Sequence, residues 1–361
     1  WADRVKAAPE ALRREFERRN NGELPAGWKK AISTARAEFI ASGKDMATRS
    51  ASGAVLDHLA AAIPELLGGS ADLTPSNNTK AKGMIEIKPG DYSGTYMHYG
   101  VREHGMAAAM NGIALHGGLI PYGGTFLCFS DYCRPAIRLA ALMHIRTVFV
   151  MTHDSIGLGE DGPTHQPVEQ LAALRAIPGL AVFRPGDPVE TAECWELILD
   201  APRRAALIAL SRQPMPLLRR EPGDENKSAR GAYVLAEAEG GNRKLTLIGT
   251  GSELQLAVAA RDLLQKEGIP TAVVSMPCRL IFEEQGAAYK KAVMGATHAR
   301  VAVEAAVELG WERYIGFQGR FVGMHSFGAS GKIGDVYKKF EITTEAVVRA
   351  AHETLAEIAA G

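Results

Sequence analysis

Cysteine is scarce in this sequence, with four residues in 361. These are Cys128, Cys133, Cys194 and Cys278, and no two of them form a CxxC pair. Cysteines this sparse do not build a disulfide scaffold. We therefore expect a protein of a reducing compartment, the cytoplasm.

Membrane spans, a secretion signal and an excess of one charge are also missing. No apolar run is long enough to cross a bilayer, and the first residues lead into a charged stretch rather than a signal peptide. Lys plus Arg and Asp plus Glu number 41 each, so no global field favours nucleic acid or an acidic membrane. We expect neither as a partner, and any anionic ligand must be held by local basic groups.

Four segments differ in composition. Residues 1–40 are rich in Arg and Glu, which predicts a helical arm or interdomain linker with a thin apolar stripe. Residues 41–215 and 231–361 each alternate short apolar runs with amphipathic segments. Between them, residues 216–230 combine proline with a charged run, which predicts a linker. The first residue is Trp1 rather than Met, which suggests a processed or truncated chain.

Strand and helix patterns alternate in both longer segments. Buried strands are predicted at 147–151, 205–210, 245–248, 272–275 and 300–304. Helices are predicted at 169–176, 189–199 and 252–267. This alternation predicts an α/β protein of two domains, each a mostly parallel sheet flanked by helices.

The turn at residues 249–253, Gly-Thr-Gly-Ser-Glu, follows a predicted strand and opens a predicted helix. That is the context of a phosphate-binding loop. The turn lacks the third glycine of a dinucleotide fingerprint and the Lys-Ser/Thr pair of a P-loop. A tight strand-to-helix turn is therefore the simpler interpretation.

The densest cluster of reactive residue types lies at 152–167, directly after a predicted buried strand. It holds His153, His165 and three acidic residues in one loop. Ligand sites of open α/β sheets lie at the carboxyl ends of strands, so the pattern predicts an active-site loop. The alternative is a surface loop with incidental polar groups. A zinc site is not indicated, because neither histidine has a second one three to five residues away.

Residues 157–170, GLGEDGPTHQPVEQ, resemble the signature loop of transketolases. Further motifs of that family occur in the expected order along almost the whole chain. They are residues 68–73 with 76–77, 98–103, 117–118, 125–126, 210–213 and 249–253. The resemblance implies a pyrimidine-binding domain of the thiamine-diphosphate-binding fold at 41–215 and a transketolase C-terminal domain at 231–361.

The resemblance also implies a reaction. Transketolases move a two-carbon ketol unit from a ketose phosphate to an aldose phosphate through a carbanion of thiamine diphosphate, in the pentose phosphate pathway and the Calvin cycle. Thiamine diphosphate and Mg²⁺ are therefore the expected cofactors, and sugar phosphates the expected substrates. The cofactor carries the difficult chemical step, and the protein supplies orientation and electrostatics.

Glu103 matches the carboxylic acid that protonates the aminopyrimidine ring of the cofactor. Without the resemblance, it would be interpreted as an exposed glutamate at the start of a helix. Phe126, Phe129 and Tyr132 recur three residues apart, which usually means core packing on one helical face. The resemblance implies that they wall the pyrimidine ring. It also assigns cofactor contacts to Asp72 and Leu73.

The sugar phosphate needs cationic and hydrogen-bonding groups. By resemblance these are Arg49, Ser76, His153 and Arg212. Arginine suits this role because its planar fork binds phosphate oxygens in pairs, although surface salt bridges are the common alternative. Asp161 is expected to accept a hydrogen bond from a substrate hydroxyl. His165 is expected to hydrogen-bond near the reacting carbons and to shuttle protons.

A complete transketolase also has a preceding domain, which binds the diphosphate through Mg²⁺ with a Gly-Asp-Gly motif and a later Asn. Nothing in this sequence matches it, so the metal ligands are expected in that domain and not here. We expect a fragment or a split subunit that is inactive alone and needs that domain as a partner. The complete enzyme is expected to be a homodimer. Residues 324–331 only approximate the family pattern, so no ligand is assigned there.

Two alternatives stay open. A neighbouring thiamine enzyme, such as deoxyxylulose-phosphate synthase or the beta subunit of a 2-oxoacid dehydrogenase, would supply the glutamate but not the signature loop. A non-catalytic fragment that binds partners is the second alternative. The intact Glu103 and His165 argue against decay by mutation.

Overall fold

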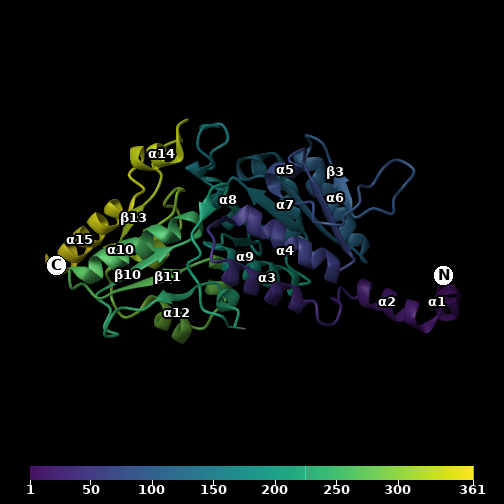
Figure 1. Cartoon of the computed structure of the whole chain (residues 1–361), viewed down its shortest axis with the longest axis horizontal. Helices are drawn as coiled ribbons and strands as arrows, with labels where there is room; N and C mark the ends of the chain where they lie inside the picture. The colour runs from purple at the N-terminus through teal and green to yellow at the C-terminus, as the bar shows by residue number, and fades with distance from the viewer. Residues whose placement is uncertain (224, 361) are drawn as a thin grey trace.

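The computed structural model describes residues 1–223 and 225–360. Two α/β units lie side by side along the long axis, and a helical arm extends from the first of them (Figure 1). The arm begins with α1 (Ala2–Ala7) and α2 (Glu10–Asn20). The first unit runs to β8 (Pro214–Met215), and the second begins with β9 (Tyr233–Ala236).

The first unit is built on a parallel six-stranded sheet with strand order β3-β2-β4-β5-β7-β6. Its strands are β2 (Leu66–Ser70), β3 (Tyr96–His98), β4 (Ile120–Phe126), β5 (Val148–Thr152), β6 (Ala181–Phe183) and β7 (Ala206–Leu210). Its helices are α3 (Lys29–Ser42), α4 (Thr48–Ala62), α5 (Thr74–Asn77), α6 (Glu103–His116), α7 (Ser130–Leu142), α8 (Gln170–Arg175) and α9 (Pro188–Leu199). The predicted strands at 147–151 and 205–210 and both predicted helices of this unit are confirmed within a residue or two.

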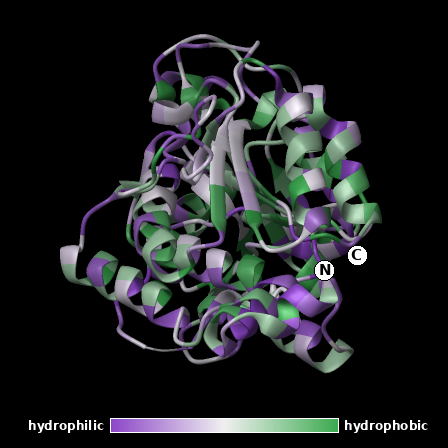
Figure 2. Cartoon of the chain, turned by 90° about the vertical axis from the view of Figure 1, so that its right-hand side faces the viewer, coloured by the Kyte–Doolittle hydropathy of each residue, from purple (hydrophilic) through white to green (hydrophobic). Residues whose placement is uncertain are grey.

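Both faces of this sheet are covered by helices, which Figure 2 shows on either side of the central strands. Strand β5 explains why, because all five of its residues are buried. Val148 and Val150 pack into a core with α3, α4 and α9, whereas Phe149 and Met151 pack into a second core with α6, α7 and α8. Successive strand residues point to opposite faces, so a continuous apolar run needs a helix layer on each side.

The second unit has a five-stranded sheet with order β13-β12-β10-β11-β9, in which only β9 runs antiparallel. The remaining strands are β10 (Leu245–Gly249), β11 (Thr271–Ser275), β12 (Arg300–Val303) and β13 (Arg320–Val322). The helices are α10 (Leu254–Lys266), α11 (Arg279–Glu283), α12 (Ala287–Met294), α13 (Glu312–Ile315), α14 (Ile333–Lys339) and α15 (Thr344–Ala360). The predicted α/β class with two mostly parallel sheets is thus confirmed.

The first forty residues divide into two parts. Helices α1 and α2 bury none of their residues, as expected of an arm. Helix α3 instead places Ile32 and Phe39 in the core of the first unit, against α4 and α9. An ion pair between Arg18 and buried Glu65, at 2.7 Å, fastens α2 to the start of β2.

The segment between the two units packs on the first unit at its start. Strand β8 pairs with β1 (Met46–Ala47), and Leu217 is buried. Arg219 forms a bidentate ion pair with buried Glu193 of α9, with distances of 2.6 and 2.7 Å. Among the described residues, no helix is both long enough and apolar enough to cross a membrane.

Candidate functional site

The carboxyl ends of four neighbouring strands meet at one edge of the first sheet. Ser70 of β2 is paired with Gly124 of β4, and Thr152 of β5 is paired with Phe126 of β4 and with Leu210 of β7. The candidate residues stand at these strand ends or just after them. They are Asp72, Leu73 and Ser76 after β2, Phe126 and Phe129 at the end of β4, His153 after β5 and Arg212 after β7. The sheet therefore brings together residues that are far apart in sequence.

Arg49 and Arg212 are positioned by two reciprocal hydrogen bonds between the residues that precede them, Thr48 and Ser211. The backbone N–H of Ser211 donates to Thr48 Oγ1 at 2.7 Å, and the N–H of Thr48 donates to Ser211 Oγ at 3.0 Å. Both hydroxyl groups are buried. Burial, and then the charge of Arg212, lowers the pKa of Arg49. The two guanidinium groups are therefore close enough to repel each other.

Arg49 also reaches toward the loop after β2. Its Nη1 donates a hydrogen bond to the backbone carbonyl of Ser76 at 2.8 Å. Ser76 lies in the short helix α5, and its side chain is partly exposed. Two of the expected phosphate ligands are therefore in direct contact.

A chain of buried polar groups fixes the orientation of His153. Ser70 Oγ donates to Asn77 Oδ1 at 2.9 Å, and Asn77 Nδ2 donates to Thr152 Oγ1 at 2.7 Å. The Thr152 hydroxyl lies 2.8 Å from His153 Nδ1. We assign the proton of the Thr152 hydroxyl to Nδ1, because Oγ1 already accepts from Asn77, and this assignment leaves the imidazole proton on Nε2.

His153 is buried, and its imidazole stacks on Phe126 with ring centroids 3.7 Å apart. Its backbone φ of 60° lies in the left-handed region, which is uncommon for a residue with a side chain. Burial, followed by the charges of Arg49, Arg212 and His165, lowers the pKa of His153 to about 3. The imidazole is thus neutral at physiological pH and can donate a hydrogen bond from Nε2.

Three aromatic rings form a continuous stack from the sheet edge to the surface. Phe126 and Phe129 are stacked at 5.7 Å, and Phe129 and Tyr132 lie 5.8 Å apart. The expectation that they share one helical face is wrong, because Phe126 is the last residue of β4 and only Tyr132 lies in α7. Exposure rises along the stack from buried Phe126 to Tyr132, which is 65% exposed. His165 lies edge-on to Phe129 at 5.5 Å.

Glu103 is the first residue of α6 and is 8% exposed. Its position corrects the alternative of an exposed helix-start glutamate. The part of the chain that the structure describes supplies no hydrogen-bond partner for this carboxyl. Burial, and next the charge of Glu103, raises the pKa of Cys133 to about 12. Glu103 therefore lies near the helix that carries Tyr132, as a buried acid with an unused side chain.

Asp72 and Asp161 are exposed, and Leu73 is partly exposed. Asp72 has a φ of 63° directly after β2, and Leu73 is held by a hydrogen bond from its N–H to Ser70 Oγ at 3.1 Å. Asp161 is exposed on the loop after β5 and precedes Gly162, whose φ of 79° turns the chain. Asp72 and Leu73 thus lie at the same edge of the sheet as His153, and Asp161 lies on the loop that begins with His153.

The turn at residues 249–253 does not serve as a phosphate loop in this fold. The guanidinium group of Arg184 lies against it and donates to the carbonyl of Thr250 at 2.9 Å. A Cβ on Gly251 would come within 2.5 Å of that group. The interpretation as a tight turn is thus supported, since a cation occupies the place of a phosphate.

Sequence reasoning missed the supporting residues Thr48, Asn77, Thr152 and Ser211. Each is a single small polar residue at a strand or helix end. Asn77 and Ser211 lie within motifs of the resemblance and Thr152 opens the loop at 152–167, but no role was assigned to any of the four. Their partners come from segments up to 163 residues away, which no local pattern reveals.

The arrangement fits a planar heteroaromatic ring beside an anion. A ring with a basic nitrogen could lie against the exposed side of the aromatic stack, with Glu103 as its acid. Two arginines and a neutral imidazole could bind the oxygens of a phosphate. Among the described residues, no group of three or more His, Cys, Asp or Glu side chains could hold a metal ion.

Two protein families match successive parts of the chain. The transketolase pyrimidine-binding domain matches residues 44–216, and the transketolase-like C-terminal domain matches residues 231–343. Together they span both sheets and the whole of the site described above.

Relatives and solved structures agree with these families. A transketolase from Cereibacter sphaeroides is 54% identical over 98% of this chain and 53% of its own length. A transketolase structure from Pichia stipitis, in complex with sedoheptulose 7-phosphate, has a TM-score of 0.90 and 40% identity over 99% of this chain and 52% of that one. A split-gene transketolase, an inactive β4 tetramer, shares the fold over 99% of its length, with a TM-score of 0.71 and 23% identity.

The chain spans about half the length of the curated relatives that it matches. The half that it spans holds the candidate residues at the edge of the first sheet, the aromatic stack and the turn at residues 249–253. We conclude that the chain belongs to the transketolase family, as its pyrimidine-binding and C-terminal domains.

Proposed function

We propose that this chain, together with a diphosphate-binding domain, transfers a two-carbon ketol unit from a ketose phosphate to an aldose phosphate. The observation that carries the proposal is the convergence of Arg49, Arg212 and neutral His153 beside an aromatic stack and a buried acid. We place the reaction in the pentose phosphate pathway or the Calvin cycle, which interconvert sugar phosphates, and in the cytoplasm. The four buried, unpaired cysteines fit that compartment.

Thiamine diphosphate, when bound, would supply the carbon nucleophile that carries the ketol unit. On this chain, Phe126, Phe129 and Tyr132 would hold its pyrimidine ring by stacking and apolar contact. Asp72 and Leu73, at the end of β2, would border the same ring. Glu103 would hold a proton at the ring nitrogen, a role that suits the carboxyl of a largely buried residue with no other hydrogen-bond partner among the described residues.

The substrate phosphate would be held by Arg49, Arg212, His153 and Ser76. Neutral His153 would donate from Nε2, while the arginines supply the positive charge. Asp161 would accept a hydrogen bond from a substrate hydroxyl. His165, which lies between the aromatic stack and the loop, would hold or move a proton near the reacting carbons.

Mg²⁺ would bind the diphosphate in the partner domain, with ligands outside this chain. We further propose that the complete enzyme is a homodimer. The outer surface of α6 and α7 supports this, because it exposes several large apolar side chains. Leu115, Tyr132, Leu139 and Leu142 lie on these helices, and Leu119 and Met143 lie just after them; all six are at least 38% exposed. Such a patch is typical of an interface.

The remaining alternatives are weaker. The matching families and the curated relatives named above are transketolases, which disfavours a subunit of another thiamine enzyme. A purely structural fragment would not need an unpartnered buried Glu103 or a neutral His153 facing two arginines.

The test is a coupled assay with xylulose 5-phosphate, ribose 5-phosphate, thiamine diphosphate and Mg²⁺. The pure 361-residue chain should show no turnover, because it leaves the charged end of the cofactor unpaired. Adding the separately produced diphosphate-binding domain of a close relative should restore activity. Full turnover by the chain alone would overturn the requirement for a partner domain. A reconstituted complex that binds thiamine diphosphate but transfers no ketol unit would overturn the proposed reaction.

A further inference from the structure

Asp154 is a buried carboxylate for which the proposed reaction has no use. It directly follows His153, is 2% exposed, and accepts a hydrogen bond at Oδ2 from Arg184 Nε at 2.9 Å. Its other oxygen, Oδ1, has no hydrogen-bond partner in the described part of the chain. The charge of Asp154 is therefore compensated through Arg184.

Arg184 connects this carboxylate to the second sheet. It follows β6 and is fully buried. Its Nη1 donates to Glu253 at 2.6 Å, and its Nη2 donates to the Ser252 hydroxyl at 3.1 Å. At Gly251, φ is 57° and a Cβ would clash with the guanidinium group, so the glycine makes room for the arginine.

The rest of the loop after β5 also rests on the C-terminal domain. Gln166 Nε2 donates to the carbonyl of Ala329 at 3.0 Å, and Ser330 Oγ donates to the carbonyl of Glu160 at 2.6 Å. The hydroxyl of Tyr337 in α14 lies 3.4 Å from the Ser155 hydroxyl of the loop and donates to Glu253 at 2.7 Å. The loop that carries His153, Asp161 and His165 is thus held from outside its own domain.

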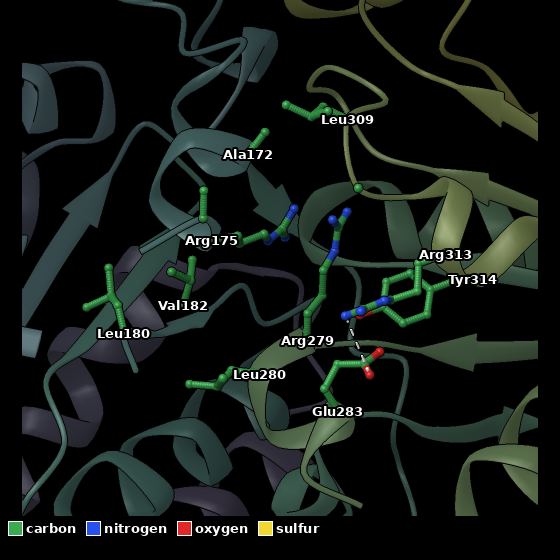
Figure 3. Close-up of a pocket in the computed structure, with 12 residues that line it drawn as sticks. Ala172, Arg175, Leu180, Val182, Arg279, Leu280, Glu283, Leu309, Arg313 and Tyr314 are labelled. Carbon is green, nitrogen blue, oxygen red and sulfur yellow. Dashed lines mark ion pairs between the residues drawn. The ribbon is translucent and has the colours of Figure 1, made fainter. Parts of the chain in front are cut away.

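Arg184 belongs to a buried cluster whose charges balance. The cluster sets Arg175, Arg184 and Arg279 against Asp154, Glu253 and Glu304. Figure 3 shows Arg175 and Arg279 converging at a cavity of about 480 Å³ between the two domains. Although burial raises the pKa of Glu304, the charges of Arg175, Arg279 and Arg184 lower it to about 2.

Glu304 is therefore satisfied by Arg175, which binds it at 2.7 and 2.8 Å. Within the cluster, the ion pair of Arg184 with Asp154 connects the C-terminal domain to the loop after β5. A buried ion pair is costly to break, because the remaining partner is left uncompensated. The left-handed conformation of His153 likewise persists only where the surroundings hold it.

We propose that Arg184 is a positioning residue, which holds His153 against Phe126 through Asp154 and so lets the C-terminal domain set the affinity for the substrate phosphate. This inference rests on the proposed function, in which His153 binds that phosphate. It gives the C-terminal domain a role in substrate binding without contact with the substrate.

The test uses the complete enzyme, with its diphosphate-binding domain. Asp154→Asn removes the charge pair and keeps the shape of the side chain. We expect the KM for xylulose 5-phosphate to rise about tenfold or more, because small displacements of a binding group are costly. We expect kcat to stay within about threefold and kcat/KM for xylulose, which lacks the phosphate, to be unchanged.

Gly251→Ala provides a second variant in case Asp154→Asn does not fold. It displaces Arg184 from the side of the C-terminal domain and leaves Asp154 and His153 unaltered. Gly268→Ala is the matched control, because its φ is 76° and a Cβ there meets nothing within 4 Å. We expect Gly251→Ala, but not Gly268→Ala, to raise the KM for the phosphorylated donor.

Equal losses for xylulose and xylulose 5-phosphate would mean that the cluster acts only on stability, and the positioning role would fail. An unchanged KM in folded Asp154→Asn would have the same consequence. Failure of the proposed function is distinguishable, since the wild-type enzyme would then show no ketol transfer, or no preference for the phosphorylated donor.

Discussion

Glu103 is the residue whose chemistry the proposed reaction depends on most. Glu103→Gln keeps the size of the side chain but removes the proton that a carboxylic acid can hold. In the complete enzyme, we expect kcat to fall about a hundredfold or more, which is the usual contribution of a positioned acid. The KM for the sugar phosphates should change little. Proton–deuterium exchange at the reactive carbon of bound cofactor is the measurement, and an unchanged exchange rate would remove Glu103 from this role.

Asp161 is expected to distinguish substrates by the configuration of one hydroxyl group. An ionised carboxylate only accepts hydrogen bonds, so it rewards a hydroxyl that points toward it. Asp161→Ala should lower kcat/KM for the preferred donor by about tenfold to a hundredfold, the value of a hydrogen bond to a charged group. A donor with the opposite configuration at that centre should be little affected. If both donors lose equally, Asp161 acts by shaping the loop.

His153 should make stability depend on pH. Its pKa is lowered to about 3 in the folded chain by burial and by neighbouring positive charges, whereas an unfolded histidine titrates near 6.5. Between these values the unfolded chain binds one more proton, so stability falls as pH falls. From pH 8 to pH 5, His153 should cost about 2 kcal/mol of unfolding free energy.

His153→Gln cannot take up that proton. Urea unfolding of wild type and variant at several pH values is the measurement. The unfolding free energy of the wild type minus that of the variant should become smaller between pH 8 and pH 5. Parallel curves for the two proteins would show that His153 is not held neutral by the fold.

Residues of the site that lie in a recognisable motif could be assigned from the sequence, whereas residues that act through distant partners could not. The site residues were assigned because a long, specific loop and several short motifs occur in the order expected of the family. Asn77, Thr152 and Arg184 were not assigned, since each acts through a hydrogen bond or an ion pair with a segment distant in sequence. The spacing of Phe126, Phe129 and Tyr132 is that of one helical face, whereas Phe126 is the last residue of β4 and stacks on Phe129 of the following turn.

Among the secondary-structure elements, buried strands were the most predictable. Strands such as β5 and β7 are short, almost entirely apolar and followed by polar loops, so their pattern alone identified them. Helix α3 was less predictable. Its apolar residues are too few to distinguish a core helix from an arm, and only their packing against α4 and α9 settles the matter.

Helices α2 and α3 should therefore differ in their contribution to stability. Phe39→Ala removes a ring that is 4% exposed in the core of the first domain, and should lower the free energy of unfolding by about 3–5 kcal/mol. Phe16→Ala, on α2, removes a side chain that is 40% exposed and should cost much less. Urea unfolding of both variants is the measurement. Similar losses would mean that the arm is as firmly packed as α3.

For the whole molecule, the exposed apolar surface of α6 and α7 predicts self-association. Leu139→Glu places a charge on that surface at a side chain that is 46% exposed, and should shift the complete enzyme toward monomer. Leu263→Glu, on α10 of the C-terminal domain, is a matched control at 39% exposure. Light scattering over a range of concentrations is the measurement. A dimer that tolerates Leu139→Glu as well as Leu263→Glu would place the interface elsewhere.

The depth at which the cysteines lie has a practical consequence. All four are buried, and burial raises the pKa of Cys128 and Cys133 to about 12 and that of Cys278 to about 11. Burial raises the pKa of Cys194 as well. Alkylating reagents attack the thiolate, so the folded chain should resist them at neutral pH. A cysteine introduced at the fully exposed Phe317 would then be the one thiol that a maleimide dye modifies quickly. A fluorescent reporter could thus be attached to the C-terminal domain without first replacing the native cysteines.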